Sequence, residues 1–183
     1  MSTKCRLRGG FSIRLSRQKY FFSSPFRQIG NLLSSVAVAK SLTILLAEDE
    51  DNDVFLMRRA LEKAGVAHPL KVVRDGEEAL QYIQGRGEFT DRSTHPMPAI
   101  LLLDLKMPKK SGFEVLEWIR QQDGLRRLPV IMLSASSQDH DVRKAYNLGA
   151  NSYLTKPSEF DKLVELVRMV EMNWLKINIC PPL

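Results

Sequence analysis

The chain has 183 residues, of which 44% are hydrophobic and 26% are charged, a composition typical of a folded globular protein. No apolar run approaches the roughly 20 residues that a membrane-spanning helix needs, so we expect no transmembrane helix. The two cysteines, Cys5 and Cys180, lie near opposite ends of the chain and lack the spacing of a metal site. They indicate reduced thiols in a cytoplasmic protein.

The net charge of +6 is distributed unevenly along the chain. Residues 1–40 hold eight Lys or Arg and no Asp or Glu, which leaves 19 basic and 21 acidic residues for 41–183. The basic character therefore belongs to the N-terminal segment and is no evidence that the rest of the chain binds nucleic acid. We expect residues 1–40 to be a basic, disordered extension. A targeting peptide, or a basic arm that contacts a phosphate polymer or a membrane surface, is the alternative.

From residue 41 onward, short apolar runs alternate with segments of helical period. In chain order, strands are predicted at 42–47, 70–73, 99–104, 129–134 and 152–156, and helices at 51–65, 75–85, 111–122, 141–150 and 159–177. Ser111, with Glu114 three positions later, predicts a capping box at the start of the third helix. Ser158 is well placed to cap the last helix.

The predicted strands indicate the fold class. Unbroken apolar runs are typical of strands that helices cover on both faces, as in parallel sheets. Right-handed crossovers between such strands give a doubly wound α/β sandwich. We therefore expect one α/β domain over residues 41–183.

Charged and polar residues follow four of the five predicted strands. Glu48 and Asp49 follow the first strand, Asp104 ends the third, Ser134 ends the fourth and Lys156 ends the fifth. The carboxyl ends of parallel strands meet at one edge of the sheet, where ligands bind. The second strand ends near residues 74–75 and adds nothing obvious to this group.

Neighbouring strands lie ~4.8 Å apart, so carboxylates at two adjacent strand ends repel one another unless a positive charge separates them. Mg²⁺ suits such a site because it binds a few carboxylates and shares its coordination shell with phosphate oxygens. The ammonium of Lys156 supplies a second positive charge. An aspartate placed between the two is prepared to attack phosphorus, so Asp104 is predicted to be a phosphoryl acceptor.

Four motifs, "AEDE", "LLLDLKMPKKSG", "LSAS" and "NSYLTKP", resemble in order and spacing the receiver domain of two-component response regulators. The resemblance covers roughly residue 41 to the C-terminus. It implies a flavodoxin-like (βα)5 fold, a doubly wound parallel sheet of five strands in the order 2-1-3-4-5. It also implies a phosphorylation-dependent switch in phosphorelay signal transduction, which is not an enzyme beyond its own phosphotransfer and autodephosphorylation.

The resemblance also implies roles for single residues. Asp104 would be the phosphoacceptor, and Lys156 would balance its charge, followed by a cis bond to Pro157. The Ser134 hydroxyl would donate a hydrogen bond to a phosphoryl oxygen at the catalytic site. Ser134 and Tyr153 would be the switch residues. The implied magnesium site consists of Asp49 and Asp104 as direct ligands, Glu48 acting through water, and the backbone carbonyl of Lys106.

The implied partner is a sensor histidine kinase, and no separate output domain follows in the sequence. The segment "VFLMRRALEKAG", the long loop before the third strand and the Trp-containing ending look most like the response regulators that partner bacterial phytochromes. Relatives of that kind form dimers. An apolar ending fits either a homodimer or packing over the domain's own core, and consists of Met172, Trp174, Leu175, Ile177 and Ile179.

Two other functions are weighed against the receiver. A haloacid dehalogenase-type phosphatase also uses an Asp nucleophile, but it needs a second Asp two residues later, where this chain has Lys106. The other is a receiver-like module that binds partners without being phosphorylated, although every chemical position is filled. The three histidines, His68, His95 and His140, are predicted to be loop or surface residues without a metal-site spacing.

Overall fold

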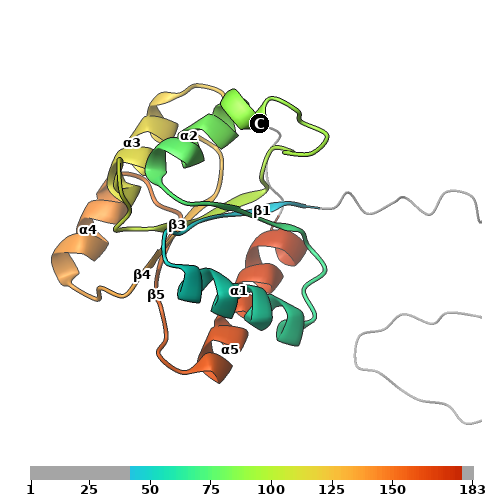
Figure 1. Ribbon diagram of the computed structural model, residues 1–183. Helices are drawn as coiled ribbons and strands as arrows, with labels where there is room; N and C mark the ends of the chain where they lie inside the picture. The colour runs from blue at the N-terminus through green and yellow to red at the C-terminus, as the bar shows by residue number, and fades with distance from the viewer. Residues whose placement is uncertain (1–41, 179–183) are drawn as a thin grey trace, which may run out of the picture. The chain divides into compact units, whose positions relative to one another are not determined.

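A parallel sheet of five strands forms the centre of the computed structural model, which describes residues 42–178 (Figure 1). The strand order is β2-β1-β3-β4-β5, and every neighbouring pair is parallel, as the resemblance implied. The strands are β1 (Ile44–Ala47), β2 (Leu70–Val73), β3 (Ile100–Asp104), β4 (Val130–Ser134) and β5 (Ser152–Thr155). The helices are α1 (Asp51–Ala64), α2 (Gly76–Gln84), α3 (Gly112–Gln121), α4 (Asp139–Asn147) and α5 (Phe160–Val170).

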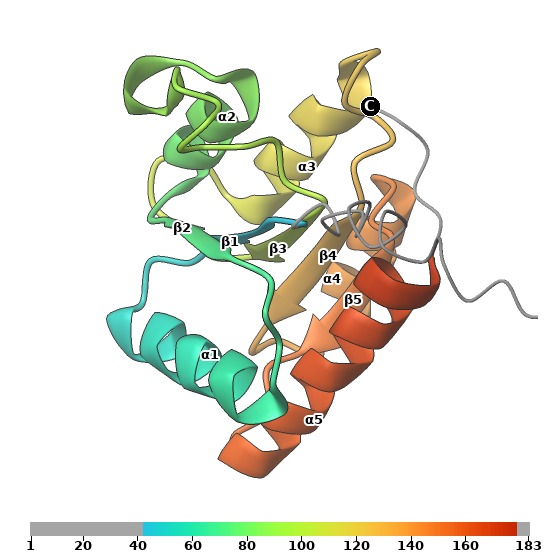
Figure 2. The same cartoon turned by 90° about the vertical axis from the view of Figure 1, so that its right-hand side faces the viewer.

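Helices cover both faces of the sheet. One apolar layer joins the sheet to α1 and α5, and the other joins it to α2, α3 and α4 (Figure 2). Alternate strand residues enter opposite layers, so Leu45 and Leu101 lie on one face while Ile44 and Ile100 lie on the other. Every residue of β1, β3 and β4 is buried, which explains why these strands are apolar runs without alternation.

The helix boundaries confirm one capping prediction and contradict another. Ser111 and Glu114 form the predicted capping box at the start of α3. Ser158 does not cap α5, because the residue before that helix is Glu159 and its side chain makes no capping bond. The last helix is also not regular throughout, since α5 passes into a π-helical segment (η2) at Glu171–Ile177.

Part of the apolar ending packs over the domain's own core. Leu175 is buried, and Trp174 packs against the same apolar layer as α1 and α5. Met172 and Ile177 remain exposed, Ile177 to 66%. The predictions for Ile179, Cys5, Cys180 and the extension 1–40 fall outside the described residues.

The loop between α2 and β3 holds a short 3-10 helix (η1, Gly87–Phe89) and a half-buried histidine. His95 is a loop residue, as predicted, but its ring packs edge-on against Tyr82 and Phe89, and its Nδ1 atom is buried without a hydrogen-bond partner. None of the helices between residues 42 and 178 combines the length and apolar character needed to cross a bilayer.

Candidate phosphoryl-acceptor site

The carboxyl ends of β1, β3, β4 and β5 surround one cavity of about 240 Å³. Six residues singled out in the sequence line it, from the loops and strand ends at this edge of the sheet: Glu48, Asp49, Asp104, Lys106, Ser134 and Lys156. Asp104 is the last residue of β3 and Ser134 the last of β4, while Lys156 directly follows β5. The parallel sheet thus brings together side chains that lie far apart in the sequence.

The Lys156 ammonium lies at the centre of the charged groups. Its Nζ atom is 2.6 Å from Glu48 Oε2, 2.8 Å from Asp53 Oδ2 and 2.7 Å from Asp104 Oδ1. An ammonium has three N–H donors, so three carboxylates match its capacity. Burial disfavours the charged amine, but these hydrogen bonds outweigh burial and raise the pKa of Lys156.

Glu48 is the most buried of these acids, with 2% of its surface exposed. Burial raises the pKa of Glu48, and the hydrogen bond from Lys156 opposes that rise. The backbone N–H of Glu50 also donates to Glu48 Oε1, at 3.4 Å. The loop after β1 therefore places two carboxylates, those of Glu48 and Asp49, in the lining of the cavity.

Asp104 is 6% exposed and has one defined partner for each of its carboxylate oxygens. Oδ1 faces Lys156, and Oδ2 accepts a hydrogen bond from the backbone N–H of Lys106 at 2.5 Å. The loop then folds back, and the N–H of Gly112 donates to the carbonyl of Leu105 at 3.0 Å. A Cβ atom at Gly112 would overlap the carbonyl oxygen of Asp104, so this tight return requires glycine.

A polar network links Ser134 to α4. Ser134 Oγ accepts from the backbone N–H of Ser136 at 3.0 Å, and Ser136 Oγ donates to Asp141 Oδ2 at 2.7 Å. Tyr153, which does not line the cavity, donates its hydroxyl proton to the carbonyl of Ser136 at 2.9 Å. The half-buried Tyr153 thus bonds through its hydroxyl to the loop that follows Ser134.

The expected cis bond before Pro157 is wrong for this structure, because every peptide bond of the described residues is trans. Residues 42–178 contain no group of three or more His, Cys, Asp or Glu side chains placed to hold a metal ion. The implied magnesium site needs only two direct carboxylates, from Asp49 and Asp104, with a carbonyl and water. The oxygen-rich lining of the cavity fits such a hard cation.

Three residues of this edge were missed in the sequence. Asp53, in the first turn of α1, contacts Lys156, and its place in that turn was the only signal for it. Arg74 Nη2 lies 2.6 Å from Asp51 Oδ1, and Asp75, in the turn after β2, is buried. The end of β2 therefore contributes an ion pair and a buried carboxylate to this edge of the sheet.

Comparison with known proteins agrees with this geometry. The family model described as "Response regulator receiver domain" matches residues 44–168. The curated relative Response regulator Rcp1 of Synechocystis sp. is 38% identical over 138 residues, which are 75% of this chain and 92% of Rcp1.

Solved structures show the same likeness. Response regulator RPA3017, in red light signalling of R. palustris, is 39% identical with a TM-score of 0.75, covering 78% of this chain and 99% of that one. The Mn²⁺-bound form of Rcp1 is 38% identical with a TM-score of 0.68, covering 76% and 99%. The phosphorylated cyanobacterial phytochrome response regulator RcpA is 37% identical with a TM-score of 0.70, covering 76% and 98%. The chain belongs to the receiver-domain family of two-component response regulators.

Proposed function

We propose that Asp104 accepts a phosphoryl group from the phosphohistidine of a sensor kinase. Response regulator receivers act with histidine kinases. In the transfer, an oxygen of the Asp104 carboxylate forms a bond to phosphorus while the bond between phosphorus and the imidazole nitrogen breaks, and that nitrogen keeps the electron pair. The observation that carries the proposal is the buried Asp104 carboxylate, which faces Lys156 Nζ at 2.7 Å in an open cavity.

Lys156 and a divalent cation together would balance the charge of the phosphoryl group. We infer that the cation is Mg²⁺, held by Asp49, Asp104 and the carbonyl of Lys106, with Glu48 acting through water. Bound there, Mg²⁺ would neutralise charge on the transferring oxygens. The Mn²⁺-bound form of the relative Rcp1 supports a divalent cation in this family.

Ser134 and Tyr153 would convert phosphorylation into a change of surface. The Ser134 side chain would move toward the phosphoryl group and donate its hydroxyl proton to a phosphoryl oxygen. This movement would break the hydrogen bond that Ser134 Oγ accepts from the Ser136 N–H. The loop at residues 135–138 would then move, and Tyr153 would lose its partner, the carbonyl of Ser136. The direct contacts of both side chains with this loop support the switch.

The proposed kinase is of the phytochrome type, because RcpA is a phytochrome response regulator and RPA3017 acts in red light signalling. A matched pair of kinases tests this. We expect phosphoryl transfer from a phosphorylated phytochrome kinase to exceed transfer from a kinase of another sensor class at least tenfold. Equal rates from both kinases would contradict the preference.

We further propose a homodimer that uses the exposed apolar residues of α5 and η2. Met169, Met172 and Ile177 are 58%, 47% and 66% exposed. Sedimentation of the native chain and of Ile177→Asp, each with and without phosphorylation, tests this proposal. A native chain that sediments as a monomer in both states would rule it out.

The acceptor is tested with a small acyl-phosphate donor such as acetyl phosphate. The native chain should gain one phosphoryl group by intact mass when Mg²⁺ is present, and lose it again by hydrolysis. Asp104→Asn should gain none. Asp123→Asn, at a fully exposed position, is the matched control and should behave like the native chain. A native chain that gains no phosphoryl mass, or an Asp104→Asn variant that gains as much, would overturn the proposal.

A further inference from the structure

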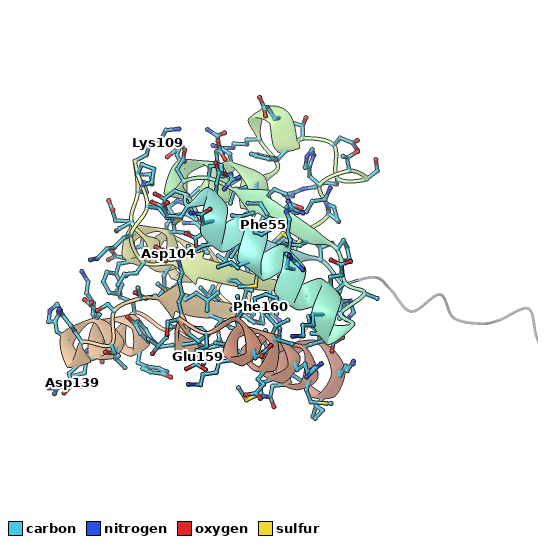
Figure 3. The ribbon with its side chains drawn as sticks, turned by 60° about the horizontal axis from the view of Figure 1, so that its bottom comes forward. Phe55, Asp104, Lys109, Asp139, Glu159 and Phe160 are labelled. Atoms are coloured by element: carbon cyan, nitrogen blue, oxygen red, sulfur yellow. The ribbon has the colours of Figure 1, made fainter. Side chains whose placement is uncertain are left out.

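The turn after β2 contacts two loops that carry site residues. In the sheet, β1 separates β2 from β3, so the ends of β2 and β3 are not neighbours. Nevertheless, Lys109 Nζ, from the loop after β3, lies 2.6 Å from Asp75 Oδ2 in the turn after β2. Lys109 and Asp104, from the same part of the chain, are labelled in Figure 3. Arg74 Nη1 in the same turn donates to the carbonyl oxygen of Glu48, in the loop after β1, at 3.4 Å. One turn therefore bonds to both loops.

Asp75 is a fixed anchor within that turn. Its side chain is buried, and Oδ1 accepts from the backbone N–H of Glu78 at 2.8 Å, which caps α2. Oδ2 remains for Lys109. A Cβ atom at Gly76, the first residue of α2, would overlap the carbonyl oxygen of Lys110, so the helix start and the loop touch directly. The loop after β3 thus rests against the start of α2.

Lys109 is held in an unusual backbone conformation. Its φ angle is +61°, and within residues 42–178 it is the single non-glycine residue with a positive φ. Lysine avoids this region unless the surrounding structure imposes it. The ion pair with the buried Asp75 connects this residue to the turn after β2.

The loop of residues 105–112 is closed on itself, so a shift at Lys109 reaches the acceptor site. Gly112 N donates to the carbonyl of Leu105, and Lys110 N donates to the carbonyl of Pro108 at 2.7 Å. Lys106 N donates to Asp104 Oδ2 within the same short segment. Residues that hold metal ligands in place without touching the metal change the metal affinity when they are removed.

We propose that Asp75 and Lys109 are positioning residues that hold this loop so that the carbonyl of Lys106 and the carboxylate of Asp104 stay arranged for a divalent cation. The inference rests on the proposed function, because it assigns these residues to the same metal site. Their effect is on metal affinity and not on the rate of phosphorylation once the metal is saturating.

Two substitutions separate the ion pair from its surroundings. Asp75→Asn keeps a side-chain oxygen that caps α2 but removes the charge. Lys109→Asn removes the ammonium, and asparagine tolerates a positive φ. By calorimetry on the full chain, each variant should raise the Mg²⁺ dissociation constant about 3- to 10-fold, at or below the range known for groups behind metal ligands. The double variant should bind no more weakly than the weaker single variant.

Two further measurements exclude a merely structural role. The Mg²⁺ concentration that gives half the maximal phosphorylation rate should rise with the dissociation constant, while the maximal rate stays within twofold of native. In metal-free protein, amide hydrogen exchange in residues 105–112 should quicken in both variants. Arg126→Gln is the matched control, because it breaks an exposed ion pair with Asp123 and should change none of these quantities.

The outcomes distinguish the inference from the proposed function. If folded Asp75→Asn and Lys109→Asn bind Mg²⁺ as tightly as native, the positioning role is wrong. A lower maximal rate at saturating Mg²⁺ with an unchanged dissociation constant would also overturn it. If the native chain itself neither binds Mg²⁺ nor accepts a phosphoryl group, it is the proposed function that fails.

Discussion

The ammonium of Lys156 lies 2.7 Å from Asp104 Oδ1, and this ion pair joins the end of β3 to the residue after β5. In the sheet, β4 lies between these two strands, and its last residue is Ser134. The pair therefore reaches across the end of one strand, and Asp104, Ser134 and Lys156 line one cavity. Three carboxylates share this ammonium, so the contribution of Lys156 to the free energy of unfolding should exceed that of a single ion pair.

Lys156→Met should destabilise the metal-free chain, because Glu48, Asp53 and Asp104 would lose the cation that they share. Removing one partner of a buried ion pair costs about 3–5 kcal/mol, and the partial exposure of Lys156 reduces the expected loss to about 2–3 kcal/mol. Mg²⁺ should restore part of this loss by supplying positive charge. Urea denaturation at neutral pH, with and without MgCl₂, measures both effects.

Lys162→Met is the matched control for that experiment. Lys162 pairs with Glu159 at 2.6 Å, but both side chains are largely exposed. Exposed pairs of this kind contribute about 0.2–1 kcal/mol, and Mg²⁺ should not alter the result. Equal losses in the two variants would show that the shared ammonium has no special role in stability.

Glu48→Gln should stabilise the metal-free chain at neutral pH. Burial raises the pKa of Glu48, so its contribution to stability is present below its ordinary pKa and is lost as pH rises through the raised value. A neutral Gln of similar shape avoids that cost. We therefore expect the free energy of unfolding of Glu48→Gln to exceed that of the native chain at pH 7, and the difference to disappear near pH 4.

The measurement is urea denaturation at the two pH values, with Glu117→Gln as the exposed control. Glu48→Gln should also bind Mg²⁺ more weakly than the native chain, since a carboxylate next to the proposed cation is lost. A loss of stability at pH 7 would show that the bond to Lys156 outweighs the burial of Glu48.

The sequence predicted the parallel sheet because strands that are buried on both faces consist of unbroken apolar runs. Runs such as Ile100–Asp104 are apolar until their last residue, and that residue then lies at the carboxyl edge. The rule that parallel strands end at one edge was enough to bring Asp104, Ser134 and Lys156 to one cavity. The strand order came from the family resemblance, since neither composition nor period specifies it.

What the sequence did not reveal depends on side chains that meet across loops. Asp53 reads as an ordinary acid in the first turn of a helix, and Asp75 as an ordinary cap. Their partners, Lys156 and Lys109, are identified only when the loops are placed in space. For Ser158 the sequence predicted a contact that the structure does not contain. A suitable residue near a helix start does not cap the helix unless the helix begins directly after it, and α5 begins after Glu159.

Ser111→Ala should reduce the free energy of unfolding by about 1 kcal/mol, because it removes the capping box of α3. Ser158→Ala provides the control from the same chain, since Ser158 makes no capping bond to α5. Its unfolding free energy should remain within about 0.5 kcal/mol of native. Urea denaturation of both variants measures this difference, and a larger effect at Ser158 would contradict the structure.

Tyr153→Phe should lower the free energy of unfolding of the unphosphorylated form more than that of the phosphorylated form. The hydroxyl donates to the carbonyl of Ser136 at 2.9 Å, and a bond of this kind contributes about 1 kcal/mol. If Tyr153 leaves this carbonyl when Ser134 moves, the loss should be smaller when beryllofluoride, a phosphoryl mimic, is bound. Denaturation with and without the mimic measures the difference, and equal losses in both states would argue against movement of Tyr153.

The acid stability of the chain should depend in part on the pair of Asp75 and Lys109. Burial opposes the ionisation of Asp75, but hydrogen bonds from Lys109 and from the backbone N–H of Glu78 outweigh it and lower the pKa of Asp75. A lowered pKa contributes stability above the ordinary value of about 3.9, and this contribution is lost as pH falls through the folded-state value.

Asp75→Asn lacks this titrating group, so its unfolding free energy should fall less steeply than that of the native chain below about pH 4. Lys109→Asn should lose part of the same dependence, because Lys109 provides the strongest of the hydrogen bonds that lower the pKa. Urea denaturation at several pH values between neutrality and the acid limit checks both variants. Parallel acid profiles for native and Asp75→Asn would show that Asp75 ionises with the same pKa in the folded and unfolded chain, and the ion pair with Lys109 would then add nothing to stability.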